Sequence, residues 1–382
     1  MKTAQHLGLN TLRDGVSWQF VQKTAYGDVN FKDYDKIVKI ITEDYNMNIL
    51  STITSTADFA KEPFAEKYAN NNPPPVWWSY PPNTAMFTDY ISKLANRYAN
   101  NSKIIWEIWN EPDCCFSQGF FCGTTEQYLE ILRIAATEIR KVNPNAYVAP
   151  GGLALNVQYG TANNHHDMYE YFLGYRELID QGLIDGYGIH IHGAFDDEAF
   201  LNPIVKYNNS ATNANIRNVE TMVMESGVPI AQENAASHLV DKMLYFRSHG
   251  KKMFIQFSLM DLPGLEPEKN KGIFTKKLAP RDSAIAYAAL IGKLGQASYK
   301  ETISNVTSLY AARYYDKEKD QTIVPVYSQE GKGETIMIPN NSYVYDMYGN
   351  IMYGGKLTTE KTYVASLSPI YIVVSGNQQI TL

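Results

Sequence analysis

Residues 106–112 read Trp106-Glu-Ile-Trp-Asn110-Glu111-Pro112, and this stretch decides the fold that we expect. Its apolar and aromatic residues predict a β-strand, which should stop at Pro112 because proline has no N–H to donate to a sheet. Asn110 and Glu111 are therefore expected at the C-terminal tip of that strand, where barrels of alternating strands and helices keep their chemistry. A carboxyl group among indole rings is partly desolvated, which raises its pKa and suits a general acid near neutral pH. The alternative is a strand that ends in a solvated turn.

Strand-like and helix-like patterns alternate over the first three-quarters of the chain, which is typical of βα units around a parallel sheet. Strands are expected at Thr11–Trp18, Asn48–Ile53, Ile104–Trp109, Tyr147–Gly151, Gly186–His192, Thr221–Glu225 and Phe254–Leu259. The clearest helices are expected at Ala85–Tyr98, Thr125–Val142, Tyr169–Gln181, His238–His249 and Asp282–Gly295.

The pattern changes at about Ser298, where short alternating stretches are separated by turn signals such as Glu330-Gly-Lys-Gly333. This pattern predicts a small antiparallel β domain. We therefore expect a catalytic α/β domain over residues 1–297 and a β domain over residues 298–382.

Composition limits the classes of function. A chain of 382 residues with 45% apolar residues can form one large barrel and a small second domain. The net charge of −6 argues against a nucleic-acid partner, and no apolar run is long enough to span a bilayer. Aromatic residues make up 13% of the chain, which fits stacking on sugars but equally an aromatic-rich core.

The three cysteines, Cys114, Cys115 and Cys122, lie in one segment just after Glu111. Adjacent cysteines rarely pair with each other, so one of the first two is expected to bridge to Cys122. A zinc site is the weaker alternative because no nearby histidine completes a familiar spacing. A disulfide indicates an oxidising compartment, so we expect a secreted or periplasmic protein, although no signal peptide is recognisable at Met1.

Two motifs resemble those of the clan A glycoside hydrolases. Residues 106–112 resemble the family's fourth strand, and Thr221-Met-Val-Met-Glu225-Ser-Gly227 resembles the strand that ends in Glu-x-Gly. The resemblance implies a (β/α)8 TIM barrel and cleavage with retention, without metal or organic cofactor. It also implies that Glu111 is the acid/base and Glu225 the nucleophile, both at the C-terminal ends of barrel strands.

The alignment that this resemblance gives makes residues 11–18 the family's second strand, so the first strand is absent from this chain or replaced by another segment. A barrel strand formed by residues 1–8 would overturn that hypothesis. The C-terminal β domain resembles the sandwich carried by families related to β-xylosidases and α-L-iduronidase.

The same resemblance suggests further site residues. Asn110 is expected to contact the sugar hydroxyl next to the anomeric carbon, and Arg13 to orient the nucleophile and keep it ionised. Glu107 shares the Glu111 face of its strand, deeper in the barrel, and Arg13 is its candidate partner. The alternatives are a capping role for Asn110 and a purely structural ion pair for Arg13.

His190 and His192 lie on one face of their strand, where the family commonly has His-x-Tyr. His190 matches that pattern, and His192 stands where tyrosine is usual. A metal site is the minor alternative because no further ligands are recognisable, and a structural role is the alternative for His192.

Candidate sugar contacts complete the predicted site. The proline-rich loop with Trp77, Trp78 and Tyr80 is expected to form a stacking wall, or else to pack over the barrel rim. Gln256 lies near the place where many family members have the tryptophan floor of the sugar subsite. The side chain of Trp18 is expected either to face the cleft or to pack in the core.

These features predict a retaining O-glycoside hydrolase that acts on a poly- or oligosaccharide and has no nucleic-acid or membrane partner. A transglycosylase with the same two glutamates and a non-catalytic carbohydrate-binding protein are the alternatives. In such a barrel the two glutamates set the chemistry, whereas the loops set the sugar and the linkage.

Overall fold

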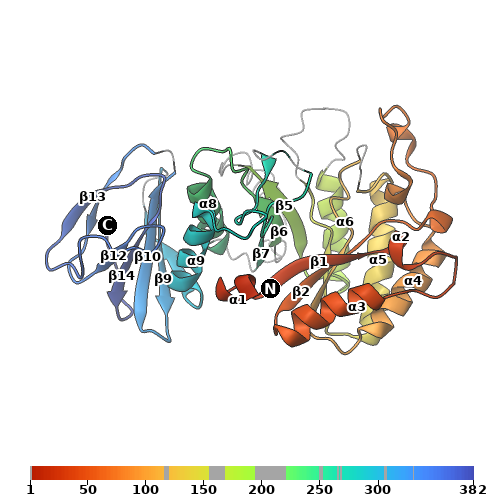
Figure 1. Ribbon diagram of the computed structural model, residues 1–382, viewed down its shortest axis with the longest axis horizontal. Coiled ribbons are helices and arrows are strands. Elements are labelled where there is room, and N and C mark those ends of the chain that lie inside the picture. The colour runs from red at the N-terminus through yellow and green to blue at the C-terminus, as the bar shows by residue number, and fades with distance from the viewer. Residues whose placement is uncertain are drawn as a thin grey trace. The chain divides into compact units, whose positions relative to one another are not determined.

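The computed structural model describes residues 2–115, 120–154, 168–193, 221–248, 253–264, 266, 269–304, 308–329 and 331–382. The chain divides into two compact units (Figure 1). Unit 1 contains Leu9–Ile191 and extends to Glu225. Unit 2 contains Thr3–Gly8 and Ser226–Leu382, together with His192 and Gly193.

Unit 1 is built on parallel strands. The first four, β1 (Thr11–Ser17), β2 (Asn48–Thr54), β3 (Ile104–Ile108) and β4 (Tyr147–Pro150), pair in chain order. Leu153, just after β4, bridges in parallel to Ile189 of β5 (Tyr187–His192), which is followed in its sheet by β6 (Thr221–Gly227). Because these strands are parallel, the C-terminal ends of neighbouring strands lie at the same edge of the sheet.

Helices separate the first five of these strands, as the alternating pattern predicts. They are α2 (Trp18–Val21), α3 (Lys32–Lys39), α4 (Thr84–Arg97), α5 (Thr125–Val142) and α6 (Met168–Asp180), with a π-helical turn at Ile40–Asp44 and 3-10 turns at Asp58–Ala60, Glu66–Tyr68 and Trp77–Ser79. The start of α5 is fixed by a capping box, in which Thr124 accepts from the Gln127 backbone and the Gln127 side chain accepts from the Thr124 backbone.

Unit 2 combines the last βα elements with the β domain. Its elements are α8 (Ala235–Ser248), β7 (Met253–Gln256), α9 (Asp282–Leu294), β8 (Ser298–Thr302), β9 (Leu309–Asp316), β10 (Gln321–Ser328), β11 (Thr335–Ile338), β12 (Tyr343–Tyr345), β13 (Lys361–Val364) and β14 (Ile370–Ser375). The β domain has a five-stranded antiparallel sheet in the order β12-β14-β10-β9-β8 and a two-stranded sheet of β11 and β13.

Strand alternation gives the five-stranded sheet two buried faces. One face, with Tyr314 and Tyr327, packs against α8 and α9 through residues such as Leu244 and Leu290 (Figure 1). The other, with Val324 and Ile372, packs against apolar side chains of the two-stranded sheet, including Ile336 and Ile338. The predicted antiparallel β-sandwich is therefore confirmed.

Most predicted elements match the structure. Helix α1 (Lys2–His6) occupies the N-terminal residues, so among the described residues the strands that alternate with helices are seven, β1 to β7, as predicted. The last of them was predicted to reach Leu259 but ends at Gln256. Beyond it, the backbones of Ser258 and Leu259 bond to Lys271, Ile273 and Phe274. No described helix is long and apolar enough to cross a membrane.

Candidate active site

A buried carboxylate, Glu107 of β3, lies at the base of the candidate site. Arg13 of β1 binds it with two N–H groups, Nε to Oε2 at 2.7 Å and Nη2 to Oε1 at 3.0 Å. Thr52 Oγ1 and the Gly152 backbone N–H also donate to Glu107, at 2.5 and 3.3 Å. Burial by itself raises the pKa of Glu107, but the Arg13 charge and the hydrogen bonds with His190 and Arg13 outweigh it and hold the pKa below its usual range.

Arg13 extends the network from Glu107 to the predicted nucleophile. Its Nη1 lies 2.7 Å from Glu225 Oε2, and its Nη2 also donates to Asn110 Oδ1. Burial lowers the pKa of Arg13, but the carboxylates of Glu107 and Glu225 raise it above the ordinary value, so the guanidinium stays charged. Arg13 thus pairs with both Glu107 and Glu225, and its role in orienting the nucleophile stays a prediction.

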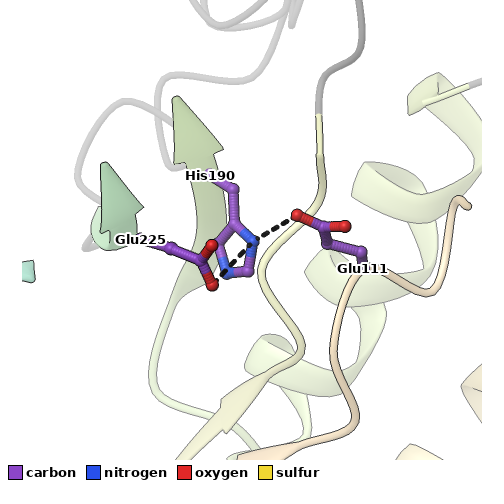
Figure 2. Close-up of side chains that lie close together, drawn as sticks. All are labelled: Glu111, His190 and Glu225. Atoms are coloured by element: carbon purple, nitrogen blue, oxygen red, sulfur yellow. Dashed lines mark hydrogen bonds and ion pairs between the residues drawn. The ribbon is translucent and has the colours of Figure 1, made fainter. Parts of the chain in front are cut away.

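His190 of β5 lies between the two predicted catalytic glutamates (Figure 2). Its Nδ1 is 2.8 Å from Glu111 Oε1 and 3.8 Å from Glu225 Oε2, and its Nε2 is 3.9 Å from Glu107 Oε1. Burial lowers the pKa of this histidine, but the charge of Glu225 and the interactions with Glu107 and Glu111 raise it to about 9. While these glutamates are ionised, the imidazole is therefore protonated at neutral pH, and Nδ1 donates to Glu111.

The two glutamates are close enough to act on one bond. One oxygen of Glu111, one of Glu225 and a nitrogen of His190 all lie within 4.8 Å of one another. Retaining glycosidases keep their two carboxyl groups about 5–5.5 Å apart, whereas inverting enzymes need more room for a water. The same trio offers ligand atoms for a metal ion, but the guanidinium of Arg13 already supplies positive charge at Glu225 and would repel a cation there.

The backbone that presents Glu111 is unusual. Trp109 has φ 73° and Glu111 has φ 40°, left-handed conformations that are rare for residues other than glycine and that often mark functional sites. Long-range hydrogen bonds hold them in place, from the Trp109 N–H to Ile53 O at 2.8 Å and from the Glu111 N–H to Gly152 O at 3.1 Å.

Gly152 and Thr52 are parts of the site that the sequence did not reveal. A Cβ at position 152 would lie 2.2 Å from His190 Cδ2, so only glycine lets the imidazole lie against this backbone. Thr52 stands beside Glu107 in the parallel register of β2 and β3. The roles of Gly152 and Thr52 depend on which strands pair, and neither residue belongs to a recognisable sequence motif.

Asp113, a fourth carboxyl group near the site, is also absent from the sequence prediction. It is buried and accepts a hydrogen bond from the Ala154 N–H at 2.9 Å. Burial, together with the nearby negative charge of Glu111, raises its pKa to about 6 despite that hydrogen bond. Its position immediately after Pro112 is the only signal that could have indicated it.

Trp18 does not line a cleft. Its ring is fully buried, stacks on Tyr90 at 4.9 Å and donates from its indole N–H to Gln22. A side chain without exposed surface offers no face to a sugar. Of the two alternatives, the structure shows the core, and the prediction of Trp18 as a substrate contact is wrong.

The remaining predicted sugar contacts are in the proline-rich loop of unit 1 and near the end of β7 and at His192 in unit 2. The partly buried Trp77 and Trp78 meet edge to face at 5.6 Å, and Tyr80 packs against Phe64. In unit 2, the ring of His192 lies 5.6 Å from that of Phe257, and Gln256 donates to the carbonyls of Phe257 and Lys271. Their assignment to sugar binding stays a prediction.

The cysteines form the expected bridge. Cys115 and Cys122 are joined by a disulfide, packed against Tyr68, and Cys114 is buried outside that bond. The predicted pairing of one adjacent cysteine with Cys122 is confirmed. The bridge fastens the segment that follows Glu111.

Comparisons with known proteins show what this chain is similar to in sequence and in fold. The family model for cellulase, glycosyl hydrolase family 5, matches residues 1–179. A family 39 glycoside hydrolase from the gut symbiont Bacteroides cellulosilyticus WH2 superposes with a TM-score of 0.71 at 18% identity, covering 98% of this chain and 77% of that one. A GH39 β-xylosidase from Caulobacter crescentus gives 0.68 at 13% identity, with 98% and 90% covered.

A glucosidase from Croceicoccus marinus gives 0.65 at 15% identity, with 99% and 92% covered. No curated protein matches the sequence. The solved structures confirm the predicted TIM-barrel fold with a C-terminal β domain. The family-model match over residues 1–179 agrees with the predicted resemblance to clan A glycoside hydrolases.

Proposed function

We propose that this chain, which has the fold of the clan A glycoside hydrolases, cleaves O-glycosidic bonds of a poly- or oligosaccharide with retention of configuration. The observation that carries the proposal is the approach of Glu111, His190 and Glu225 within 4.8 Å of one another. Glu225 acts as the nucleophile and Glu111 as the acid/base, a pairing that this short separation favours.

In the first step, an oxygen of Glu225 attacks the anomeric carbon, and the bond to the leaving oxygen breaks. Glu111 gives its proton to that oxygen, so the products are a glycosyl-enzyme ester and a free alcohol. Arg13 supports the attack because its Nη1 binds Oε2 of Glu225 at 2.7 Å, fixing the carboxylate and favouring its ionised form.

In the second step, water replaces the leaving group. Glu111, now ionised, takes a proton from the water as it attacks the anomeric carbon, and Glu225 leaves as a carboxylate. His190 positions Glu111 through the 2.8 Å hydrogen bond from Nδ1. Arg13 holds Asn110 by its amide oxygen, which leaves the Asn110 NH2 group to donate to a sugar hydroxyl.

The decisive experiment measures product release from a broad panel of plant, bacterial and host glycans, with wild type and Glu225→Gln in parallel. We expect wild type to release sugar and the variant to lose activity by about 10⁴-fold or more, as removal of a nucleophile does. Glu177→Gln, the same change at an exposed position on α6, is the matched control.

The anomeric configuration of the first product, followed by NMR, tests retention. Inverted product would contradict the double displacement, and activity that survives in Glu225→Gln would remove Glu225 as nucleophile. Transfer to an added acceptor alcohol in preference to water would indicate a transglycosylase. Binding of a glycan without release in wild type would indicate a carbohydrate-binding protein.

We place this activity outside the cytoplasm, in a secreted or periplasmic protein. The Cys115–Cys122 disulfide supports this proposal because such bonds persist in oxidising compartments. Fractionation of the source cells, followed by immunodetection, tests it, and a wholly cytoplasmic signal would contradict it.

A further inference from the structure

Unit 2 contains a cavity of about 630 Å³ whose lining the catalytic proposal does not use. Its walls come from the segment after β6 and the start of α8, from Gln256 at the end of β7, from residues 271–273, from the start of α9 and from the β domain at Met347, Tyr348 and Ser368. This volume lies in the range of about 300–1,000 Å³ that small-molecule sites occupy.

The charges around the cavity cancel. Arg281 is already neutralised, because its Nη1 and Nη2 each lie 2.8 Å from a carboxylate oxygen of Asp261. Lys271 and Asp282 add one positive and one negative charge to the lining. Strong attraction for an anion or a cation needs a surplus of the opposite charge, so this lining favours a ligand without net charge.

The uncharged part of the lining suits a sugar. Gln232 and Asn234 are exposed at the mouth and offer amide groups that both donate and accept, and Ser283 adds a hydroxyl. Val228 and Ile273 form an apolar part of the wall, and Tyr348 adds a partly exposed aromatic ring. Sugar rings present hydroxyl groups around their edge and C–H groups on their faces, and this combination matches both.

Two hydrogen bonds from its side-chain nitrogen hold Gln256 in this wall. Its Nε2 donates to Phe257 O at 3.0 Å and to Lys271 O at 3.2 Å. These bonds orient the side chain and tie the end of β7 to the segment at Lys271. The wall that they support is therefore built before a ligand arrives, which reduces the entropy lost on binding.

We propose that this cavity is a second saccharide-binding site that takes uncharged sugar residues and is lined by other residues than those proposed to cleave the glycosidic bond. The inference rests on the proposed function, because the glycan that is cut is the natural source of such sugars. Occupation of the cavity would hold a polysaccharide on the protein between cleavage events and would strengthen its binding.

The test uses full-length protein carrying Glu225→Gln, so that bound sugar is not consumed. Isothermal titration calorimetry measures binding of cellotetraose and xylotetraose, with trigalacturonic acid as the charged comparison. Ser283→Trp fills the cavity, and Gln232→Ala removes an exposed amide at its mouth without disturbing the core. Ser298→Trp, on an exposed position of β8 outside the cavity, is the matched control for the bulky change.

We expect at least one neutral oligosaccharide to bind in a way that Ser283→Trp abolishes and Ser298→Trp leaves unchanged. Gln232→Ala should weaken this binding by about 5- to 10-fold, which corresponds to the loss of roughly one hydrogen bond. Neutral oligosaccharide binding that is the same in all variants, or absent throughout, would overturn the proposal. Preferential cavity-dependent binding of trigalacturonic acid would also overturn it, because the ligand would then be anionic.

The two proposals fail in different ways. Cavity-dependent binding in a protein whose wild type cleaves no glycan would leave this site standing and remove the catalytic proposal. Glu225-dependent cleavage without any cavity-dependent binding would support the catalytic proposal and remove the second binding site. Thermal unfolding of each variant shows whether Ser283→Trp folds, and Gln232→Ala gives an independent result if it does not.

Discussion

The charged cluster at the candidate site and the five-stranded sheet of the β domain are both buried, but they are held together in different ways. At the site, Glu107 is fully buried and depends on Arg13, Thr52 and Gly152 for its hydrogen bonds. In the β domain, side chains such as Ile372 and Val324 are equally buried and need only apolar neighbours. Polar partners must be present in a specific geometry, whereas apolar contacts need only shape and volume.

The two regions therefore contribute differently, the apolar core to stability and the charged cluster to the proposed chemistry. A buried ion pair contributes little net stability, because desolvation of the charges offsets their attraction. The charged cluster is therefore better explained by the chemistry that it positions than by the stability that it adds. The β domain shows the opposite case, since its core stabilises the fold and holds none of the proposed catalytic residues.

The largest effect on stability is expected from Glu107→Gln, which breaks the pair with Arg13. Loss of one partner from a buried pair costs about 3–5 kcal/mol of unfolding free energy, because the other charge stays buried. Activity should fall by about 10²-fold, mainly in kcat, since Arg13 loses the anchor that aligns Glu225. Denaturant unfolding and steady-state kinetics measure the two effects. Unchanged kcat at a clear loss of stability would show that Glu107 is purely structural.

Ile372→Ala in β14 tests the other region. Removing most of this fully buried side chain should lower the unfolding free energy by about 2–5 kcal/mol through lost burial and a new cavity. At temperatures well below unfolding, kcat should stay near the wild-type value because no site residue is touched. A large fall in kcat in the folded variant would show that the β domain contributes to catalysis.

The pH dependence of stability sharpens the comparison. The pKa of His190 is raised from 6.5 to about 9, so its charged form stabilises the folded state fully below pH 6.5, and this contribution is lost as pH rises from 6.5 through 9. The difference in unfolding free energy between wild type and His190→Gln should shrink over this window, with a slope of at most about 1.4 kcal/mol per pH unit.

The paired comparison is needed because Lys242 acts in the opposite direction. Burial and the charge of Lys271 lower the pKa of Lys242 from 10.5 to about 7, so stability rises with pH between these values. Subtraction of the His190→Gln curve from the wild-type curve removes this common contribution. A difference that is constant from pH 6.5 to 9 would contradict the protonated His190 in the site.

The smallest effect is expected at an exposed ion pair. Lys36 and Asp33 lie 2.9 Å apart on α3, with side chains 62% and 92% exposed. Solvent screens such pairs, so Lys36→Ala should change the unfolding free energy by less than about 0.5 kcal/mol. Thermal unfolding measures this change in free energy. A loss of stability similar to that of Glu107→Gln would contradict the expected difference between buried and exposed ion pairs.

Much of the site could be predicted because its signals are local. Asn110 and Glu111 were indicated by the proline that ends their strand, and Glu225 by a short motif at the end of another strand. Gly152 and Thr52 escaped notice because their role depends on which strands pair and in what register. The sequence does not separate core from cleft for Trp18, because one aromatic residue at a strand end has no periodicity that distinguishes the two.

The sequence by itself determined the alternation of strands and helices, the change to a β domain near Ser298 and the two glutamates at strand ends. These follow from propensity, hydrophobic period and proline stereochemistry, which act between near neighbours in the chain. Only the tertiary structure decided that His190 lies between the glutamates, that Arg13 binds Glu107 and Glu225 together, and that Trp18 is in the core. Burial and pKa depend on residues that are distant in sequence, and folding alone brings these residues together.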